Sequence, residues 1–245
     1  MIDYHFGCYL MQYLDKSIEE LCENLCEKEY ENIQVGVVLV ATKCTFWLPL
    51  VIKNILNKIK NCKLYFFGSK DSICFLKESI SYNNISFHII DDFNDIKYYN
   101  RLLLNKDFWN TFKEEYVLIT QPDCIILRDI NLSDLQFDYI GAICGMLNEN
   151  FIMNGGLSIR NKNVMIQICD NLSDEQKTGN IAEDIIFSNI IAKNSKYKSP
   201  SANDCLDFSI ETIGNIDKVL GIHGTDKFYI HPLIKKQFID NYIRL

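Results

Sequence analysis

The sequence contains few of the residues that are typical of flexible linkers between domains. Its 245 residues include only four prolines and eleven glycines, and no repeat or low-complexity stretch reads as a linker. The longest apolar run of the first half, 35–41, is far shorter than the roughly 20 residues that a membrane helix needs. No basic segment followed by an apolar stretch opens the chain, so we expect no secretory signal. We therefore predict a single domain over 1–245, with no transmembrane segment, that works in the cytoplasm.

Positive charge is also scarce. The formal net charge is −7, so we expect no nucleic-acid partner, because phosphate backbones are bound mainly through clustered Lys and Arg. A small anionic ligand is not excluded, since one arginine or a metal ion can meet a diphosphate locally. No Gly-x-Gly-x-x-Gly follows the first apolar run, which argues against a nicotinamide cofactor. None of the ten cysteines has Cys-x-x-Cys spacing, and we interpret them as reduced thiols.

Hydrophobic periodicity predicts an α/β fold. Residues 1–31 are expected to form a leading amphipathic helix packed on the domain, because their apolar positions follow helical spacing. The run 33–41 is almost without polar alternation, as in strands that helices cover on both faces. Further strands are predicted at 63–67, 85–90 and 116–120, and helices at 46–59, 71–80 and 94–112. This alternation implies right-handed crossovers and a mostly parallel central sheet flanked by helices.

Beyond position 123 the predicted elements become shorter, which favours a mixed sheet. Short strands are predicted at 125–127, 139–143, 157–159 and 208–212, and helices at 163–172, at 182–192 and from 232 onward. In open α/β sheets, ligands bind at the carboxyl ends of the parallel strands. Thr42, Ser69 and the turn at 121–124 follow three such ends and are therefore the first candidates for a binding site.

Asp123 lies in the turn just after the fourth predicted strand. A carboxylate there is not needed for packing and is costly if it is buried without a partner. It suits a hard divalent cation, which takes oxygen ligands from the protein and from a diphosphate. The alternative is an aspartate that merely caps the turn. Arg101, on the helix before the same strand, offers a planar fork of donors to a diphosphate.

Two later segments could either hold a ligand or be purely structural. Asn154-Gly155-Gly156 lets a backbone approach a ligand closely, or forms a turn before a strand. The adjacent acids Glu183 and Asp184 could act on an acceptor hydroxyl, or simply favour the positive end of a helix dipole.

The order of these features resembles the GT-A glycosyltransferases. A helix with Arg101, an apolar strand, Asp123 and an Asn-Gly-Gly segment follow one another as in that superfamily. The likeness covers 35–228; it is closest to a glycosyltransferase-like family with a Gln-x-Asp turn, and more distant from the glycogenin and galactinol-synthase group. It implies a GT-A fold in which Mn²⁺ or Mg²⁺ at Asp123 bridges the donor diphosphate. Because Gln121 stands where the superfamily has an acid, the resemblance does not imply an obligatory metal.

The resemblance also implies roles for residues further along the chain. Asn154, Gly155 and Gly156 match the element that contacts the donor sugar. Asp184 matches the general base of inverting members, and Glu183 is the second candidate for that role.

A C-terminal element completes the likeness. His223, Gly224 and Lys227 resemble the His-Gly-Lys segment of the glycogenin group, in which the histidine completes the metal shell and the lysine meets the departing phosphate. The Pro and Trp that usually close the segment are absent, and Phe228 and Tyr229 stand there instead. A lone histidine is more often structural, so the role of His223 depends on the resemblance.

Together these observations predict a glycosyltransferase that moves a sugar from a nucleotide-sugar, a UDP-sugar in the first instance, to a hydroxyl of a carbohydrate or protein acceptor. Thr42 and Ser69 frame the nucleoside in this hypothesis, while Arg101 and Asp123 converge on one pyrophosphate. We favour inversion because no nucleophile lies beside the predicted donor site. Two alternatives remain: an inactive relative that binds a carbohydrate or a protein, which Gln121 favours, and a nucleotidyltransferase, whose usual Gly-rich basic loop is missing here.

Overall fold

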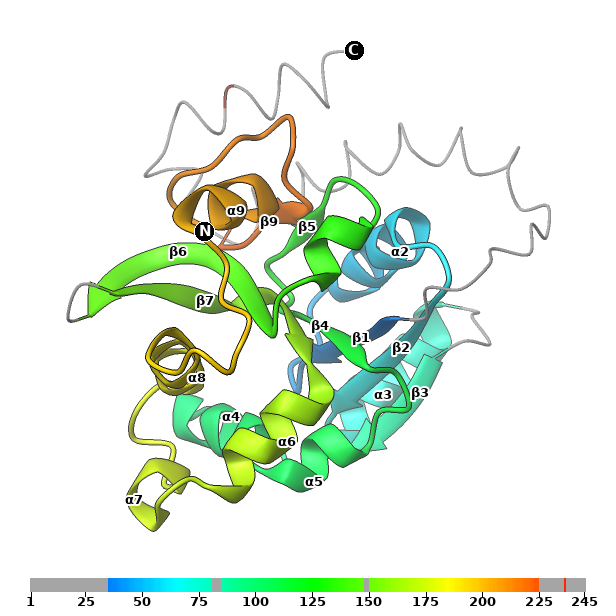
Figure 1. Cartoon of the computed structure of the whole chain (residues 1–245). Helices are drawn as coiled ribbons and strands as arrows, with labels where there is room; N and C mark the ends of the chain where they lie inside the picture. Colours follow the sequence, from blue (N-terminus) through cyan, green and yellow to red (C-terminus); the bar gives the residue numbers. More distant parts are fainter. Residues whose placement is uncertain (1–34, 81–84, 148–149, 225–235, 237–245) are drawn as a thin grey trace.

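The computed structural model describes residues 35–80, 85–147, 150–224 and 236, and its centre is a mixed sheet of six strands (Figure 1). The strand order is β3-β2-β1-β4-β7-β6. The strands are β1 (Val35–Val40), β2 (Cys62–Gly68), β3 (Ile85–Ile89), β4 (Tyr116–Thr120), β6 (Tyr139–Leu147) and β7 (Asn150–Asn161). The predicted leading helix, Lys227 and, apart from Lys236, the predicted C-terminal helix lie outside the described residues.

Helices cover both faces of this sheet. They are α2 (Leu48–Lys58), α3 (Lys70–Ser79), α4 (Ile96–Leu103), α5 (Lys106–Asn110), α6 (Lys162–Asp170), α7 (Asp174–Lys177), α8 (Glu183–Ala192) and α9 (Ala202–Phe208), with a 3-10 helix at Leu132–Leu135. In Figure 1, α4, α5, α6 and α8 gather on one side of the sheet, and α2 lies on the other. Every residue of β1 is buried, as its unbroken apolar sequence predicts. None of the helices in the described ranges is long and apolar enough to cross a membrane.

The strand directions bring distant segments to one edge of the sheet. β1 runs parallel to β2 and to β4, so the carboxyl ends of these three strands lie together. β7 runs antiparallel to β4, with Thr120 opposite Leu157. The residues just before Leu157 therefore lie at the same edge as the turn that follows Thr120. Two segments about thirty positions apart in the sequence meet there as a result.

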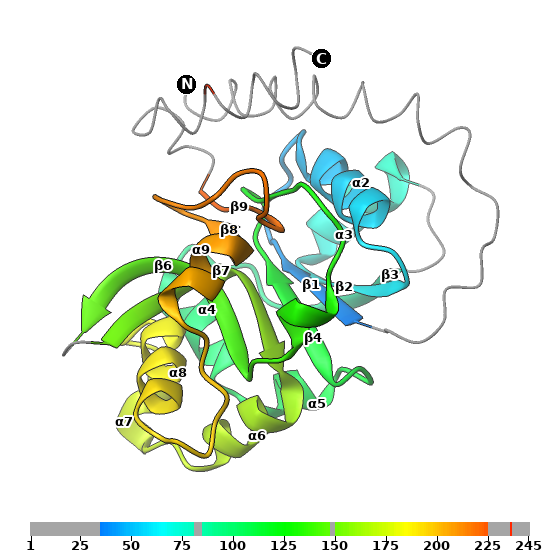
Figure 2. The ribbon, with the colours of Figure 1, turned by 45° about the horizontal axis from the view of Figure 1, so that its top comes forward.

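A second, three-stranded sheet lies beside this edge. It has the order β5-β9-β8 and consists of β5 (Ile125–Ile126), β9 (Gly221–Ile222) and β8 (Ser209–Ile210). β9 pairs with β5, so that Ile125 lies opposite Ile222. Figure 2 shows β8 and β9 over the region where β4 and β7 meet. The small sheet thus carries the chain after Ile222 back to the turn that follows β4.

Three predicted elements differ from the structure. The helix predicted at 94–112 is two helices, because Asn105 accepts a hydrogen bond from the Asp107 backbone N–H and starts α5 anew. The strands predicted at 139–143 and 157–159 belong to a long hairpin of β6 and β7, whose ladder shifts register between Gly141 and Ile143. α7 and α9 were not predicted. The seven cysteines of the described ranges form no disulfide with one another.

Candidate functional site

The turn after β4 meets His223 at the edge of the sheet. The Nε2 atom of His223 lies 2.9 Å from Oε1 of Gln121 and 3.6 Å from Oδ1 of Asp123. His223 is buried, whereas the Asp123 side chain is 43% exposed, so the cluster opens toward solvent on the side of Asp123. Two ligands at right angles around a metal with bonds of about 2.1 Å stand about 3 Å apart. The distance from Nε2 to the Gln121 oxygen matches this spacing, and the distance to the Asp123 oxygen exceeds it by about 0.6 Å, so Nε2 is close enough to both oxygens for a small adjustment to let them share one divalent cation.

Cys124 belongs to the same cluster but is poorly suited to bind a metal. Its Sγ lies within 4.8 Å of the ligand atoms of Asp123 and His223. The thiol, however, donates to the Gly156 carbonyl oxygen at 3.3 Å and accepts from the Gln121 backbone N–H at 3.4 Å. Burial, and then the charge of Asp123, raises the pKa of the Cys124 thiol well above its usual range. Because the sulfur is engaged in these two hydrogen bonds, a cation at this cluster would be held by oxygen and imidazole ligands.

The Asn154–Gly156 segment is a bulge in β7. Between Gly141 and Ile143 the partner residue on β7 changes from Ser158 to Met153, so the intervening residues of β7 bow out of the ladder. The Gly156 backbone N–H donates to Oδ1 of Asn154 at 2.6 Å, which closes the bulge on itself. The segment was predicted either to approach a ligand or to form a turn, and the structure places it at the edge that carries Asp123.

Each glycine of the bulge leaves room for a different neighbour. A Cβ atom on Gly155 would overlap Oε1 of Glu183 and one guanidinium nitrogen of Arg160, and a Cβ atom on Gly156 would overlap the ring of His223. Neither glycine has a positive φ. Both are therefore required for the space they leave and not for an unusual backbone conformation.

A buried ion pair lies directly beneath the bulge. The guanidinium of Arg160 donates to the two carboxylate oxygens of Glu183 at 2.5 and 3.0 Å, and both residues are almost completely buried. Arg160 also donates to Oγ of Ser158 and to the Gly155 carbonyl oxygen. Burial raises the pKa of the Glu183 carboxyl above its usual value, although the charge of Arg160 acts in the opposite direction. Glu183, the second candidate for the base, thus has both oxygens engaged inside the protein.

Asp184 lies at the start of α8 and faces the bulge. Its Oδ2 accepts from the Gly155 backbone N–H at 3.2 Å, and its Oδ1 accepts from the Ile185 backbone N–H at 2.8 Å. The residue is only partly buried. A carboxylate has about four lone-pair directions, so these two bonds leave capacity for a further hydroxyl. Of the two adjacent acids, Asp184 is the one placed to accept a proton from a bound molecule.

Thr42 and Ser69 lie together at another part of the same edge. They line an open hollow of about 490 Å³ at the carboxyl ends of β1, β2 and β3, together with Asp91 and Asp92. The Ser69 hydroxyl donates to the Thr42 carbonyl oxygen at 2.9 Å and caps α3 by accepting from the Ser72 backbone N–H. Both candidates are thus brought together, although the hydroxyl of Ser69 already serves the fold.

Arg101 is not brought to the turn after β4. Tyr99, two residues earlier on α4, is buried beside Gln121 and Glu183. Successive helical residues are about 100° apart, so the Arg101 side chain leaves the helix roughly 200° away from Tyr99. It is exposed, and its Cγ lies next to Gly179 in the loop before α8. The contacts of the described residues therefore give no support to the prediction that Arg101 and Asp123 meet at one pyrophosphate.

Two residues of the site were missed by the sequence analysis. Arg160 directly follows the strand predicted at 157–159 and was given no role, and its partner Glu183 is distant in sequence. Glu211 lies after β8, with its Oε2 atom 3.8 Å from Nδ1 of His223. The local pattern holds no signal for either contact, because both depend on which strands and helices become neighbours.

Comparison with known proteins adds a family. A search of the curated proteins finds no match to this chain. A family model matches residues 82–223, which is more than half of the chain. The matched region contains Asp123, the bulge, Asp184 and His223, and it leaves out Thr42, Ser69 and Lys227. The chain therefore belongs to DUF5672, a family described as a protein of unknown function.

Proposed function

We propose that this protein is a GT-A type glycosyltransferase that transfers a sugar from a nucleotide-sugar, a UDP-sugar in the first instance, to a hydroxyl of a carbohydrate or protein acceptor. One observation carries the proposal: a potential cation site, a glycine bulge and an available carboxylate meet at the carboxyl edge of β4. Asp123 and His223 provide the cation site, and Asp184 provides the carboxylate. This is the edge at which α/β sheets bind their ligands.

Each part of the nucleotide-sugar is assigned to a different group of residues. Asp123 and His223, with the amide oxygen of Gln121, would hold Mn²⁺ or Mg²⁺. When bound, the metal supplies a positive charge that stabilises the departing nucleoside diphosphate. The bulge holds the sugar, and the hollow at Thr42 and Ser69 receives the nucleoside. Arg101 has no part in this proposal, and Lys227 keeps its predicted role next to the phosphate.

Asp184 performs the proton transfer of the proposed reaction. Its carboxylate takes the proton of the acceptor hydroxyl while the acceptor oxygen forms a bond to the anomeric carbon. The bond from that carbon to the diphosphate oxygen breaks, and its electron pair leaves with the nucleoside diphosphate. A transition state of this kind resembles an oxocarbenium ion, which a nearby carboxylate also stabilises. A single displacement of this type inverts the configuration of the anomeric carbon.

Replacing Asp123 by asparagine is expected to remove the metal-dependent part of donor binding. The amide keeps the size of the side chain but loses the negative charge that attracts the cation. We would measure thermal unfolding with UDP- and GDP-sugars, each with and without Mn²⁺. A ligand at about a hundred times its dissociation constant adds about 2.7 kcal/mol to the unfolding free energy. The wild-type protein should gain stability with a donor and Mn²⁺ together, and Asp123→Asn should gain much less.

The matched control for this experiment is Asp174→Asn. Asp174 is exposed in the first turn of α7, far in sequence from the cluster, so its variant should respond to the donor and Mn²⁺ as the wild type does. If no nucleotide-sugar changes the unfolding temperature of the wild type, the proposed donor site is wrong. If Mn²⁺ and the donor stabilise Asp123→Asn as much as they stabilise the wild type, Asp123 is not a metal ligand, but the proposed donor site is still supported.

One observation favours a second candidate, an inactive relative that binds carbohydrate or protein. Gln121 replaces an acid and lies at hydrogen-bond distance from His223, so the turn can be closed without a metal. The two candidates differ in their products. An active enzyme slowly releases nucleoside diphosphate from its donor even when water is the only acceptor, whereas an inactive relative binds without releasing it.

A further inference from the structure

We infer that Glu211 and Gly156 are positioning residues for His223, and that they fix which ring nitrogen faces the turn at 121–124. The inference rests on the proposed function, because it concerns a ligand of the proposed metal site. It concerns two residues whose positions beside the ring follow from the small sheet and from the bulge in β7.

The register of the small sheet places Glu211 beside His223. β8 and β9 are parallel, with Ile210 opposite Ile222, and the His223 backbone N–H donates to the Ile210 carbonyl oxygen at 2.8 Å. Glu211 and His223 are the next residues of the two strands. In-register neighbours of parallel strands point to the same face of a sheet. The register therefore brings the carboxylate of Glu211 to the imidazole, with 3.8 Å between Oε2 and Nδ1.

The two nitrogens of His223 face different partners. Nε2 faces Gln121 and Asp123, and Nδ1 faces Glu211. A neutral imidazole binds a metal through the nitrogen that carries no hydrogen. A carboxylate beside Nδ1 favours the hydrogen on that nitrogen, which leaves the lone pair of Nε2 for a cation. Without a cation, the 2.9 Å contact between Nε2 and the amide oxygen of Gln121 requires the hydrogen on Nε2 instead. The separation of 3.8 Å is longer than a hydrogen bond, so the proposed orienting bond requires the two side chains to approach each other by several tenths of an ångström.

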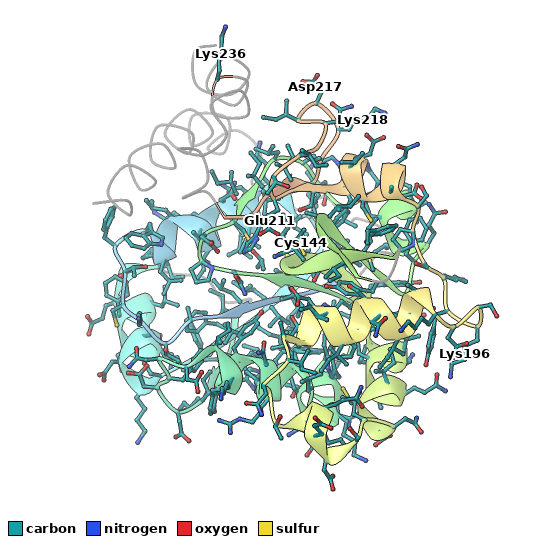
Figure 3. All side chains as sticks on the ribbon, turned by 90° about the vertical axis from the view of Figure 1, so that its left-hand side faces the viewer. Cys144, Lys196, Glu211, Asp217, Lys218 and Lys236 are labelled. Atoms are coloured by element: carbon teal, nitrogen blue, oxygen red, sulfur yellow. The ribbon has the colours of Figure 1, made fainter. Side chains whose placement is uncertain are left out.

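The burial of both side chains strengthens the interaction between the Glu211 carboxylate and the His223 ring. Glu211 is 9% exposed and His223 is 8% exposed, so water screens their interaction only weakly. Figure 3 shows Glu211 within the body of the molecule, whereas Asp217 and Lys218 project from its edge. Removing a carboxylate from water is costly. A role in orienting the ring gives a reason for its presence at this buried position.

Gly156 confines the ring from the opposite side. A methyl group at this position would overlap Nε2, Cδ2 and Cε1 of His223. The ring can therefore occupy its present place only because residue 156 has no side chain. Gly145, in the same hairpin, offers a matched comparison, because a Cβ atom there would meet no atom within 4 Å.

The test is Mn²⁺ binding by the full-length protein, followed through the electron paramagnetic resonance signal of free Mn²⁺. Gly156→Ala and Glu211→Leu should each weaken Mn²⁺ binding by about 10- to 100-fold, the range for loss of a residue that orients a metal ligand. Glu211→Gln keeps an acceptor oxygen and should retain an intermediate affinity. Gly145→Ala and Glu175→Gln, an exposed position on α7, should bind as the wild type does.

The outcomes separate the inference from the proposed function. The graded order of wild type, Glu211→Gln and Glu211→Leu supports an orienting carboxylate, because a merely structural role would not make the amide an intermediate. If the wild type binds Mn²⁺ and both Glu211 variants bind it equally well, the inference is overturned while the metal site stands. If the wild type binds no Mn²⁺, with or without UDP, the metal site and the inference both fail.

Discussion

Asp184→Asn should lower the rate of sugar transfer by about 10²- to 10⁴-fold, the usual contribution of a general base. The amide oxygen can still accept the hydrogen bond from the Gly155 backbone N–H, so the bulge should keep its place, while the weaker local bond from the Ile185 backbone N–H is lost. It cannot take the proton of an acceptor hydroxyl. The loss should therefore fall on kcat and leave donor binding almost unchanged.

The measurement is release of nucleoside diphosphate from the donor, which works with water as the acceptor. Thermal unfolding with the donor and Mn²⁺ serves as the binding control, and Asp174→Asn serves as the matched carboxamide variant. If Asp184→Asn loses both turnover and donor-induced stabilisation, Asp184 binds the donor and is not the base. Full turnover in this variant would remove Asp184 from the mechanism altogether.

Arg160→Met should lower the free energy of unfolding by about 3 to 5 kcal/mol, because it leaves the buried carboxylate of Glu183 without its partner. The guanidinium also holds Ser158 and the Gly155 carbonyl oxygen, so these bonds are lost as well. Urea unfolding followed by circular dichroism gives the free energy. The double variant Arg160→Met, Glu183→Leu should recover part of the loss, since apolar residues often replace a buried ion pair at little cost.

An exposed ion pair provides the contrast. Lys106 and Asp170 lie 2.7 Å apart with side chains about half exposed, and water screens their interaction. Lys106→Met should leave the unfolding midpoint almost unchanged. A similar loss of stability in Lys106→Met and Arg160→Met would contradict the idea that burial makes the Arg160 pair decisive. So would a double variant that is no more stable than Arg160→Met alone.

The sequence predicted the parts of the fold that depend on local pattern. The run 35–41 could be assigned to a fully buried strand because it has almost no polar residue, and β1 is buried throughout. Helix ends were less certain. Asn105 caps α5 and so separates it from α4. A single asparagine within a helical pattern often leaves the helix continuous, so the sequence did not show that a new helix begins here. The glycines at 155 and 156 suggested a turn, although the chain continues through them as one strand with a bulge.

The candidate site was predictable as a set of strand ends and not as a set of contacts. Thr42, Ser69 and Asp123 all follow parallel strands, so their common edge could be deduced from the alternation of strands and helices alone. Arg101 was assigned from its position before β4, but its helical neighbour Tyr99 takes the side that faces Gln121. The partnerships of Arg160 and Glu211 depend on strand register and helix packing. The local hydrophobic pattern of the sequence gives no signal for either partnership.

The surroundings of Arg160 also give this protein an internal optical probe. The chain has only two tryptophans, and Trp109 is one of the residues whose rings enclose the guanidinium, with Tyr139 and Phe187 as the others. Its indole N–H donates to the Leu103 carbonyl oxygen, so the ring has a fixed orientation. Ultraviolet emission from this side chain therefore originates next to the charged group beneath the bulge. The fluorescence of Trp109 is therefore expected to change when the surroundings of Arg160 change, and the Arg160 guanidinium itself contacts Glu183 and the Gly155 carbonyl oxygen.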